Sequence, residues 1–123
     1  MRFTGEQQIR IEQLKMFARV GVTRSERARR QRLILNITLW PARDLRDLQD
    51  SIGRTVDYSL VCKETKLFLS RQSSKLLETL ANDLAAHLLA KFRVQKTSVE
   101  IRKFVLKNAA YVAATVTRTA SLD

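Results

Sequence analysis

The sequence contains little of what several classes of protein depend on. Its 123 residues include one cysteine, one proline and three glycines. A single cysteine excludes a disulfide framework and a zinc ribbon, and 45% hydrophobic residues with so little proline and glycine exclude a disordered chain. Residues 1–13 hold no apolar core of a secretion signal, and the longest apolar run, 109–114, is far shorter than the roughly 20 residues of a membrane span. We therefore expect a reduced, soluble, cytoplasmic protein with one domain over residues 1–123.

Acidic residues are also scarce. Twelve Asp and Glu stand against 23 Lys and Arg, which gives a formal net charge of +11. This charge is either a solvated basic surface or the mark of an anionic partner, such as nucleic acid or a phosphorylated ligand. With only 7% aromatic residues, the Arg-rich segment 24–32 would bind nucleic acid only non-specifically. A non-enzymatic basic nucleic-acid-binding protein is the alternative from a different class.

Two stretches alternate between apolar and polar residues, which is typical of strands. In residues 9–22 the apolar phase changes beside Glu12–Gln13, which predicts one long strand with a bulge. The second stretch, 33–39, is ended by Pro41, because proline cannot donate a hydrogen bond to a neighbouring strand. The polar segment 23–30 between them is predicted to be a hairpin loop.

The period then changes to 3.6 residues, which is typical of amphipathic helices. Apolar residues in 58–69 predict a first helix, and Thr55 or Asp57 is its expected cap, because their side-chain oxygens can accept the free N–H groups of a first turn. Apolar residues in 77–92 predict a second helix, with Ser73 or Ser74 as its expected cap. Residues 42–54, before the first helix, are predicted to be a connection.

Alternation returns in 97–105 and in 112–116, so the predicted order is strand, strand, helix, helix, strand, strand. This order indicates an α+β domain: an antiparallel four-stranded sheet with two helices, placed between the second and third strands, on one face. The other face must be polar or be covered by another subunit. Apolar residues on both phases of the first and last strands favour oligomerisation.

Lys103 is the most informative single residue. It shares the phase of Val99 and Ile101, so its side chain is predicted to point into the core. Burying an ammonium group is costly unless it is paired or loses its proton. Such a lysine can act as a general acid or base. Alternatively, the strand frays at Arg102, or the long lysine side chain reaches past the edge of the core.

Three further residues are candidates for a site, although each also has an ordinary structural explanation. Glu78 lies in the first turn of the second predicted helix, where the helix dipole favours a carboxylate, and small side chains beside it leave room for a planar ligand with two N–H donors. Glu26 is the only acid in segment 24–32, so nearby positive charge is expected to lower its pKa. Tyr58 opens the apolar face of the first helix.

Four stretches, taken together, resemble the dihydroneopterin aldolase family. They occur in the order and spacing of that family, within a resemblance that extends from about Ile9 to Arg118: Gly21-Val22-Thr23-Arg24-Ser25-Glu26, Thr55-Val56-Asp57-Tyr58, Leu76-Leu77-Glu78 followed by Leu80-Ala81, and Ile101-Arg102-Lys103. The chain is thus identified as a single dihydroneopterin aldolase-like domain.

The resemblance implies the tunnelling fold, in which strands of several subunits close into an oligomeric barrel. Members of the family form tetrameric rings that stack into octamers, with active sites between adjacent subunits. The implied reaction belongs to folate biosynthesis: dihydroneopterin is cleaved to hydroxymethyl-dihydropterin and glycolaldehyde, with no metal, Schiff base or cofactor. The expected partners are a pterin substrate and further copies of the chain, and neither a membrane nor nucleic acid is expected.

The resemblance also implies roles for individual residues. Glu78 would match the pterin anchor, with Leu77 beside it supplying backbone contacts. Lys103 would match the catalytic lysine, which takes a proton from the substrate and returns one, directly or through water. Glu26 and Tyr58 would match the glutamate and tyrosine that complete the pocket and take part in catalysis.

One segment departs from the aldolase pattern. The family usually has Lys-Pro-Gly where this chain has Lys103-Phe104-Val105-Leu106. That segment and residues 38–42 look more like the sister dihydroneopterin triphosphate 2′-epimerases. The epimerase is therefore the alternative within the family, and a basic pocket mouth would suit its triphosphate substrate.

Overall fold

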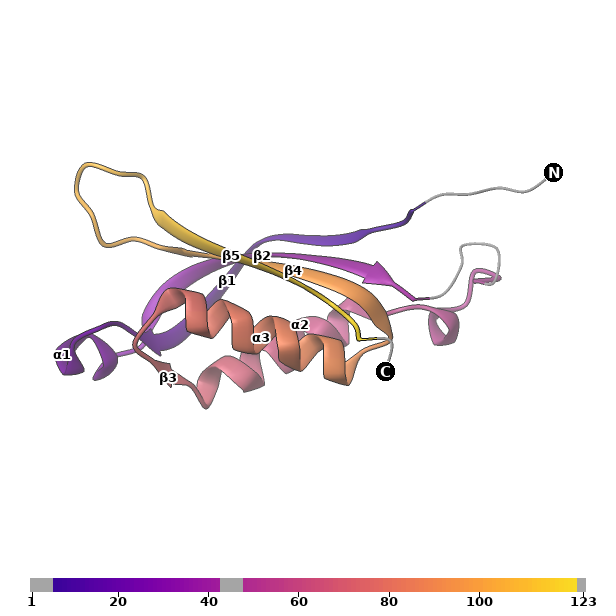
Figure 1. The fold of residues 1–123 in the computed structure, drawn as a ribbon, viewed down its shortest axis with the longest axis horizontal. Helices are drawn as coiled ribbons and strands as arrows, with labels where there is room; N and C mark the ends of the chain where they lie inside the picture. The colour runs from indigo at the N-terminus through magenta and orange to yellow at the C-terminus, as the bar shows by residue number, and fades with distance from the viewer. Residues whose placement is uncertain (1–5, 43–47, 122–123) are drawn as a thin grey trace.

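Two long helices cover one face of a five-stranded sheet in the computed structural model, which describes residues 6–42 and 48–121 (Figure 1). The strand order is β3-β1-β2-β4-β5. The strands are β1 (Ile9–Val20), β2 (Gln31–Pro41), β3 (Ser73–Ser74), β4 (Val94–Lys103) and β5 (Val112–Thr119), and the long helices are α2 (Tyr58–Ser70) and α3 (Leu77–Lys91). The predicted α+β architecture, with both helices between the second and third long strands, is confirmed.

The sheet differs from the prediction in one strand. Ser73 or Ser74 was expected to cap the second helix, but both residues form β3, which pairs in parallel with Arg19–Val20 of β1. The sheet is therefore mixed and five-stranded, not antiparallel and four-stranded. A two-residue strand is too short to produce an alternating pattern, so the sequence carries no periodic signal for it.

The helix starts follow the predictions only in part. Asp57 caps α2 as expected, because its carboxylate accepts the Ser59 N–H at 2.9 Å. At α3 the N-cap position is Leu76, and no side chain of the described residues caps it. The segment predicted as a hairpin loop contains a short helix, α1 (Arg24–Arg27). Of the predicted connection 42–54, residues 43–47 lie outside the described part, and the 3₁₀ helix η2 (Ile52–Arg54) lies near its end.

The predicted bulge in β1 is confirmed. The register with β2 shifts between Ile11 and Leu14, and Gln13 adopts a positive φ of 56°. The Gln13 N–H donates to the Asn36 side-chain oxygen at 2.8 Å, so the bulge leaves no unpaired donor there. Because the bulge adds a residue, the apolar side chains on both sides of it face the helices.

The core lies between the sheet and the two helices, and every second residue of β2 from Leu33 and of β4 from Thr97 contributes to it, together with Val94 at the start of β4. These buried residues are Leu33, Leu35, Ile37 and Leu39 from β2, and Val94, Thr97, Val99, Ile101 and Lys103 from β4. The helices contribute mainly leucine and alanine from α3. Among the described residues, no helix is long and apolar enough to cross a membrane.

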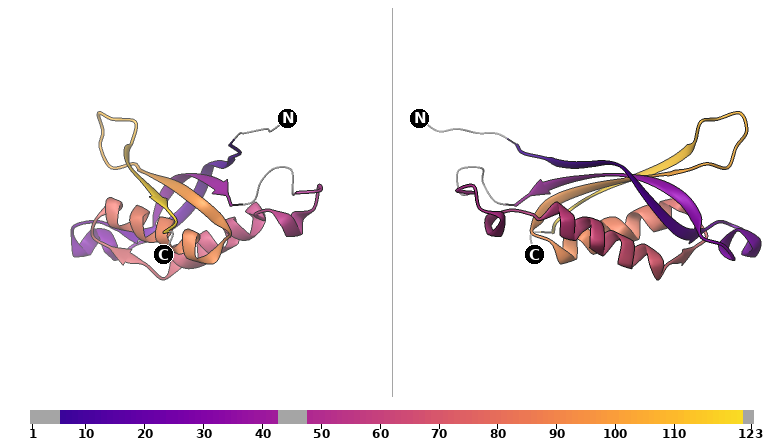
Figure 2. Two further views of the ribbon diagram at one scale, coloured as in Figure 1. Left: turned by 45° about the vertical axis from the view of Figure 1, so that its right-hand side comes forward. Right: turned by 180° about the vertical axis from the view of Figure 1, so that it is seen from behind.

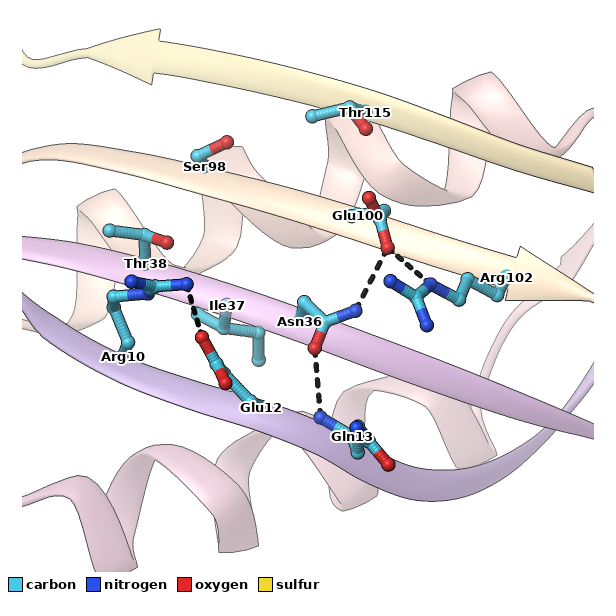
Figure 3. A pocket seen from close by; sticks show the side chains of 10 residues that line it. All are labelled: Arg10, Glu12, Gln13, Asn36, Ile37, Thr38, Ser98, Glu100, Arg102 and Thr115. Carbon is cyan, nitrogen blue, oxygen red and sulfur yellow. Dashed lines mark hydrogen bonds and ion pairs between the residues drawn. The ribbon is translucent and has the colours of Figure 1, made fainter.

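In the described part of the chain, no helix covers the opposite face of the sheet (Figure 2). Its side chains are largely polar, and they line a pocket of about 320 Å³ whose residues include Arg10, Asn36, Glu100 and Arg102 (Figure 3). A polar face without a helix is one of the two outcomes that the sequence predicts for this side of the sheet.

Candidate active site

Lys103 is buried at the end of β4, as its phase predicts. Its side chain is on the helix side of the sheet and the residue is only 8% exposed. The ammonium group donates to the Val20 carbonyl oxygen at 3.0 Å and to Oε2 of Glu26 at 3.1 Å. The ion pair offsets part of the cost of taking the charge out of water. An ammonium group has three N–H donors, so one is left for a substrate hydroxyl or a water.

Glu26 is brought to Lys103 by α1. Thr23 and Glu26 form a capping box, in which the Glu26 N–H donates to the Thr23 hydroxyl oxygen at 3.1 Å, and Oε1 of Glu26 accepts both the Thr23 N–H and its hydroxyl. Oε2 remains for Lys103. The hydrogen bonds from the Thr23 backbone and then from the Lys103 side chain hold the pKa of Glu26 below its ordinary value, so the carboxylate is charged at neutral pH.

Gly21 makes room for the Glu26 side chain. A Cβ atom at Gly21 would lie 2.3 Å from Cβ of Glu26 and 2.8 Å from its carboxyl carbon, which is closer than carbon atoms can approach. The Gly21 N–H also donates to the Ser74 carbonyl oxygen at 3.0 Å, which joins the loop to β3. Only glycine fits here without moving Glu26 away from Lys103.

Gln31 contacts the same two residues as Lys103. Its side-chain amide donates to the Val20 carbonyl oxygen at 2.6 Å and to the Glu26 carbonyl oxygen at 3.0 Å. Sequence reasoning assigned no site role to Thr23 or Gln31. For Thr23 a signal existed, because Thr-x-x-Glu is the pattern of a capping box. Gln31 has no such signal, since its contacts depend on tertiary structure.

Glu78 and Leu77 lie in the first turn of α3, at the same end of the molecule (Figure 1). Ser74, three residues before α3, pairs with Val20, whose carbonyl oxygen holds Lys103. The Glu78 side chain is exposed, whereas the Leu77 side chain belongs to the core. No described side chain caps this helix, so the N–H groups of its first turn could donate to an acceptor that lies beside the Glu78 carboxylate.

Tyr58 is the one predicted site residue that the chain does not bring to Lys103. It is the first residue of α2, and it is 58% exposed. The last residue of α2 leads to β3, beside Val20, so Tyr58 lies a whole helix away from that end. Thirteen helical residues span roughly 18 Å. One chain therefore assembles Glu26, Glu78 and Lys103 at one end and leaves Tyr58 at the other.

A family model for dihydroneopterin aldolase (FolB) matches residues 9–117, which is most of the chain. The chain belongs to the dihydroneopterin aldolase family. Solved structures of the family superpose along nearly the full length of this member. A Vibrio cholerae protein assigned as a dihydroneopterin aldolase (FolB) is 22% identical, with a TM-score of 0.87, and the match covers 95% of this chain and 100% of that one.

Two further solved structures are similar to this chain: one is a ligand complex of a dihydroneopterin aldolase, and the other is a protein outside that family. Escherichia coli dihydroneopterin aldolase in complex with neopterin is 24% identical with a TM-score of 0.82, covering 91% of this chain and 98% of that one. An archaeosine synthase QueF-like protein is only 11% identical but has a TM-score of 0.56, covering 98% of this chain and 99% of that one. These likenesses confirm the predicted tunnelling fold for the single chain.

The capping box gives a prediction about pH in this FolB family member. In Thr23→Val the pKa of Glu26 is expected to rise toward its ordinary value, because the hydroxyl that donates to Oε1 is lost. A carboxylate with a lowered folded-state pKa stabilises the fold above its ordinary pKa, and this contribution disappears as the pH falls through the folded-state value. Acid unfolding of Thr23→Val, followed by circular dichroism between about pH 6 and pH 3, should therefore begin at higher pH.

The matched control is Thr23→Ser, which keeps the hydroxyl and should unfold like the wild type. An unchanged acid-unfolding curve in Thr23→Val would show that the Thr23 hydroxyl does not stabilise the Glu26 carboxylate.

Proposed function

We propose that this protein cleaves dihydroneopterin to hydroxymethyl-dihydropterin and glycolaldehyde, in the cytoplasm and as a step of folate biosynthesis. The observation that carries the proposal is the buried Lys103 ammonium, held by Glu26 and the Val20 carbonyl with one donor left over. A lysine that only contributed to a solvated basic surface would be exposed, whereas Lys103 is buried. Two similar structures support a pterin-like substrate, because one holds neopterin and the other, from Burkholderia, holds guanine. The Burkholderia protein is 22% identical with a TM-score of 0.74, and the match covers 94% of this chain and 93% of that one.

The proposed reaction needs only proton transfers from the protein. A base removes the proton of the second side-chain hydroxyl of dihydroneopterin, and the bond between the first and second side-chain carbons breaks. The bonding electrons move into the ring C=N next to the side chain, so the ring itself is the electron sink, and glycolaldehyde leaves. The enamine carbon that remains then takes up a proton. Lys103 is the proposed group for both transfers, directly or through a water. Its uncharged amine form takes the hydroxyl proton, and the ammonium group so formed, held by Glu26, gives a proton to the enamine carbon.

Glu78 is the proposed anchor for the pterin ring. A carboxylate can accept two parallel hydrogen bonds from the amino group and the adjacent ring N–H of a pterin, and such charge-assisted pairs fix orientation as well as affinity. The uncapped first turn of α3, starting at Leu77, offers backbone donors to an acceptor on the same ligand. The ring would thus be held at its edge by one helix start.

A second copy of the chain would complete the site. Among the described residues, β5 pairs only with β4, and β1 is open along most of its outer edge apart from Arg19–Val20. Since β1–β2, β2–β4 and β4–β5 are all antiparallel, β5 runs opposite to β1 and can extend the sheet of a neighbour. Repeating this contact in a closed ring gives the barrel, and we propose that it carries Tyr58 of each chain to the Lys103 end of the next.

The shared site predicts complementation between two inactive variants. Tyr58→Ala and Lys103→Ala should each be inactive alone, but co-assembled chains should recover activity. In a randomly mixed ring, about a quarter of the sites combine a wild-type Tyr58 with a wild-type Lys103, so activity should approach about a quarter of that of the wild type. The measurement is glycolaldehyde release after joint refolding. Mixtures as inactive as their components would show that both residues act within one chain.

The direct test supplies dihydroneopterin to the purified protein and follows glycolaldehyde and hydroxymethyl-dihydropterin.

A second candidate function is 2′-epimerisation of dihydroneopterin triphosphate. It is favoured by Arg24, Arg29 and Arg30, which are exposed around Glu26 and would attract a triphosphate. The same assay with the triphosphate, read by formation of the epimer, separates the two candidates. If neither substrate gives its product and the protein binds RNA tightly in a salt-dependent way, a nucleic-acid-binding protein is favoured instead.

A further inference from the structure

Two arginines and two aromatic rings meet at the base of the β4–β5 loop, directly after Lys103. The Arg32 guanidinium lies over the Phe104 ring at 4.6 Å, and the Arg102 guanidinium lies over the Tyr111 ring at 4.4 Å. The two rings meet edge to face, with centroids 6.4 Å apart and an interplanar angle of 68°. We call these four residues the Arg–aromatic cluster. It joins β2, the end of β4 and both ends of the loop.

The Arg–aromatic cluster is tied to the rest of the sheet through Arg102. The Arg102 Nε–H donates to Oε1 of Glu100, which also accepts the Asn36 side-chain amide at 2.8 Å, and Asn36 in turn accepts the N–H of the bulged residue Gln13 (Figure 3). Although burial acts to raise it, these donors hold the pKa of Glu100 below its ordinary value. The network thus runs across β4, β2 and β1 on the face without helices.

The loop is exposed along its whole length. Residues 104–111 are all exposed, and none is a proline, whose ring would fix the backbone. The segment projects beyond the body of the molecule on the side away from the helices (Figures 1 and 2). An exposed loop of this kind leaves the end of a strand free to fray unless side chains hold it.

Lys103 is the last residue of β4, between two members of the cluster. Successive residues of a strand point to opposite faces, so Arg102 and Phe104 hold the chain from one face while Lys103 enters the core on the other. If the strand end opened at Phe104, the Lys103 ammonium would be pulled from its bonds with Val20 and Glu26. The contacts of Arg102 and Phe104 on the polar face therefore help to keep the Lys103 ammonium group in its position.

We propose that the Arg–aromatic cluster is a positioning device for Lys103, which keeps the end of β4 closed and the ammonium group in place for proton transfer. The cluster residues do not touch the substrate in this proposal. The catalytic consequence rests on the proposed function, but the protection of Lys103 from solvent does not.

The test measures how quickly the Lys103 amine is modified. Reductive methylation with formaldehyde and borohydride, read by peptide mass spectrometry, labels Lys103 only when it leaves its bonds. Tyr111→Leu removes the ring face under Arg102 and the edge contact to Phe104, so labelling should become about threefold to tenfold faster. Tyr111→Phe keeps the ring and should restore the wild-type rate. Lys96→Met removes another cation–ring contact at the far end of β4 and should leave Lys103 labelling unchanged.

Turnover of dihydroneopterin supplies the second readout. Tyr111→Leu should lower kcat and leave KM unchanged, because the pterin anchor is not touched. If Tyr111→Leu does not fold, Arg32→Gln tests the same cluster from an exposed position. Wild-type labelling of Lys103 in a folded Tyr111→Leu or Arg32→Gln variant would overturn the proposal. If the variant is labelled faster at Lys103 but the wild type does not turn over dihydroneopterin, the proposed function is overturned and the positioning role of the cluster still holds.

Discussion

Replacing Lys103 by alanine is expected to lower kcat for dihydroneopterin cleavage by roughly a thousandfold, within the 10²- to 10⁴-fold range of general acid–base catalysis. The ammonium group is the buried proton donor at this end of the sheet, and Glu26 alone is a charged carboxylate that holds no proton at neutral pH. The pterin should still bind within about threefold of the wild-type affinity, because Glu78 and the start of α3 are unchanged. Stopped assays for glycolaldehyde and calorimetric titration with neopterin measure the two quantities.

Lys96→Ala is the matched control, because it removes a lysine from the other face of the same strand. It should change neither kcat nor neopterin affinity. Circular dichroism of Lys103→Ala checks that the fold survives the loss of the ion pair with Glu26. Equal losses of turnover and of pterin affinity in Lys103→Ala would count against the catalytic assignment, since they would point to a disrupted pocket.

Most of the fold could be predicted because it depends on local periodicity. The alternation in β1, with its phase change, located both the strand and its bulge, and the 3.6-residue period located both long helices. β3 could not be predicted, because two residues have no period and their pairing with Arg19–Val20 depends on a long-range contact. The wrong cap for α3 has the same cause, since Ser73 and Ser74 are used in that strand.

Candidate residues for the site could be singled out from the sequence one at a time, but their arrangement could not. Lys103 stood out because a charged residue shared the phase of the core, and the structure buries it as expected. Its pairing with Glu26 could not be deduced, because the two residues lie 77 positions apart in the chain. Gln31 joins the same group only through tertiary hydrogen bonds. The distance of Tyr58 from this group became visible only with the fold.

Replacing Glu78 by alanine is expected to abolish pterin binding in the micromolar range. Each hydrogen bond to a charged group contributes about 1.5–3 kcal/mol, so the loss of a paired set lowers affinity by about a hundredfold or more. Glu78→Gln should bind neopterin nearly as weakly as Glu78→Ala, because an amide presents one acceptor and one donor to two N–H groups of the ligand. Calorimetric titration with neopterin measures the loss without relying on turnover.

Asp83→Asn provides the matched control for Glu78, since it removes a carboxylate from the same helix five residues further on. It should bind neopterin like the wild type. The stability of the Glu78→Ala variant should also be close to that of the wild type, because the Glu78 side chain is exposed and contributes nothing to the buried core. Loss of neopterin binding without loss of stability would show that Glu78 is an anchor and not a structural residue. Unchanged neopterin affinity in Glu78→Ala would refute the anchor role and indicate that the pterin binds elsewhere in the pocket.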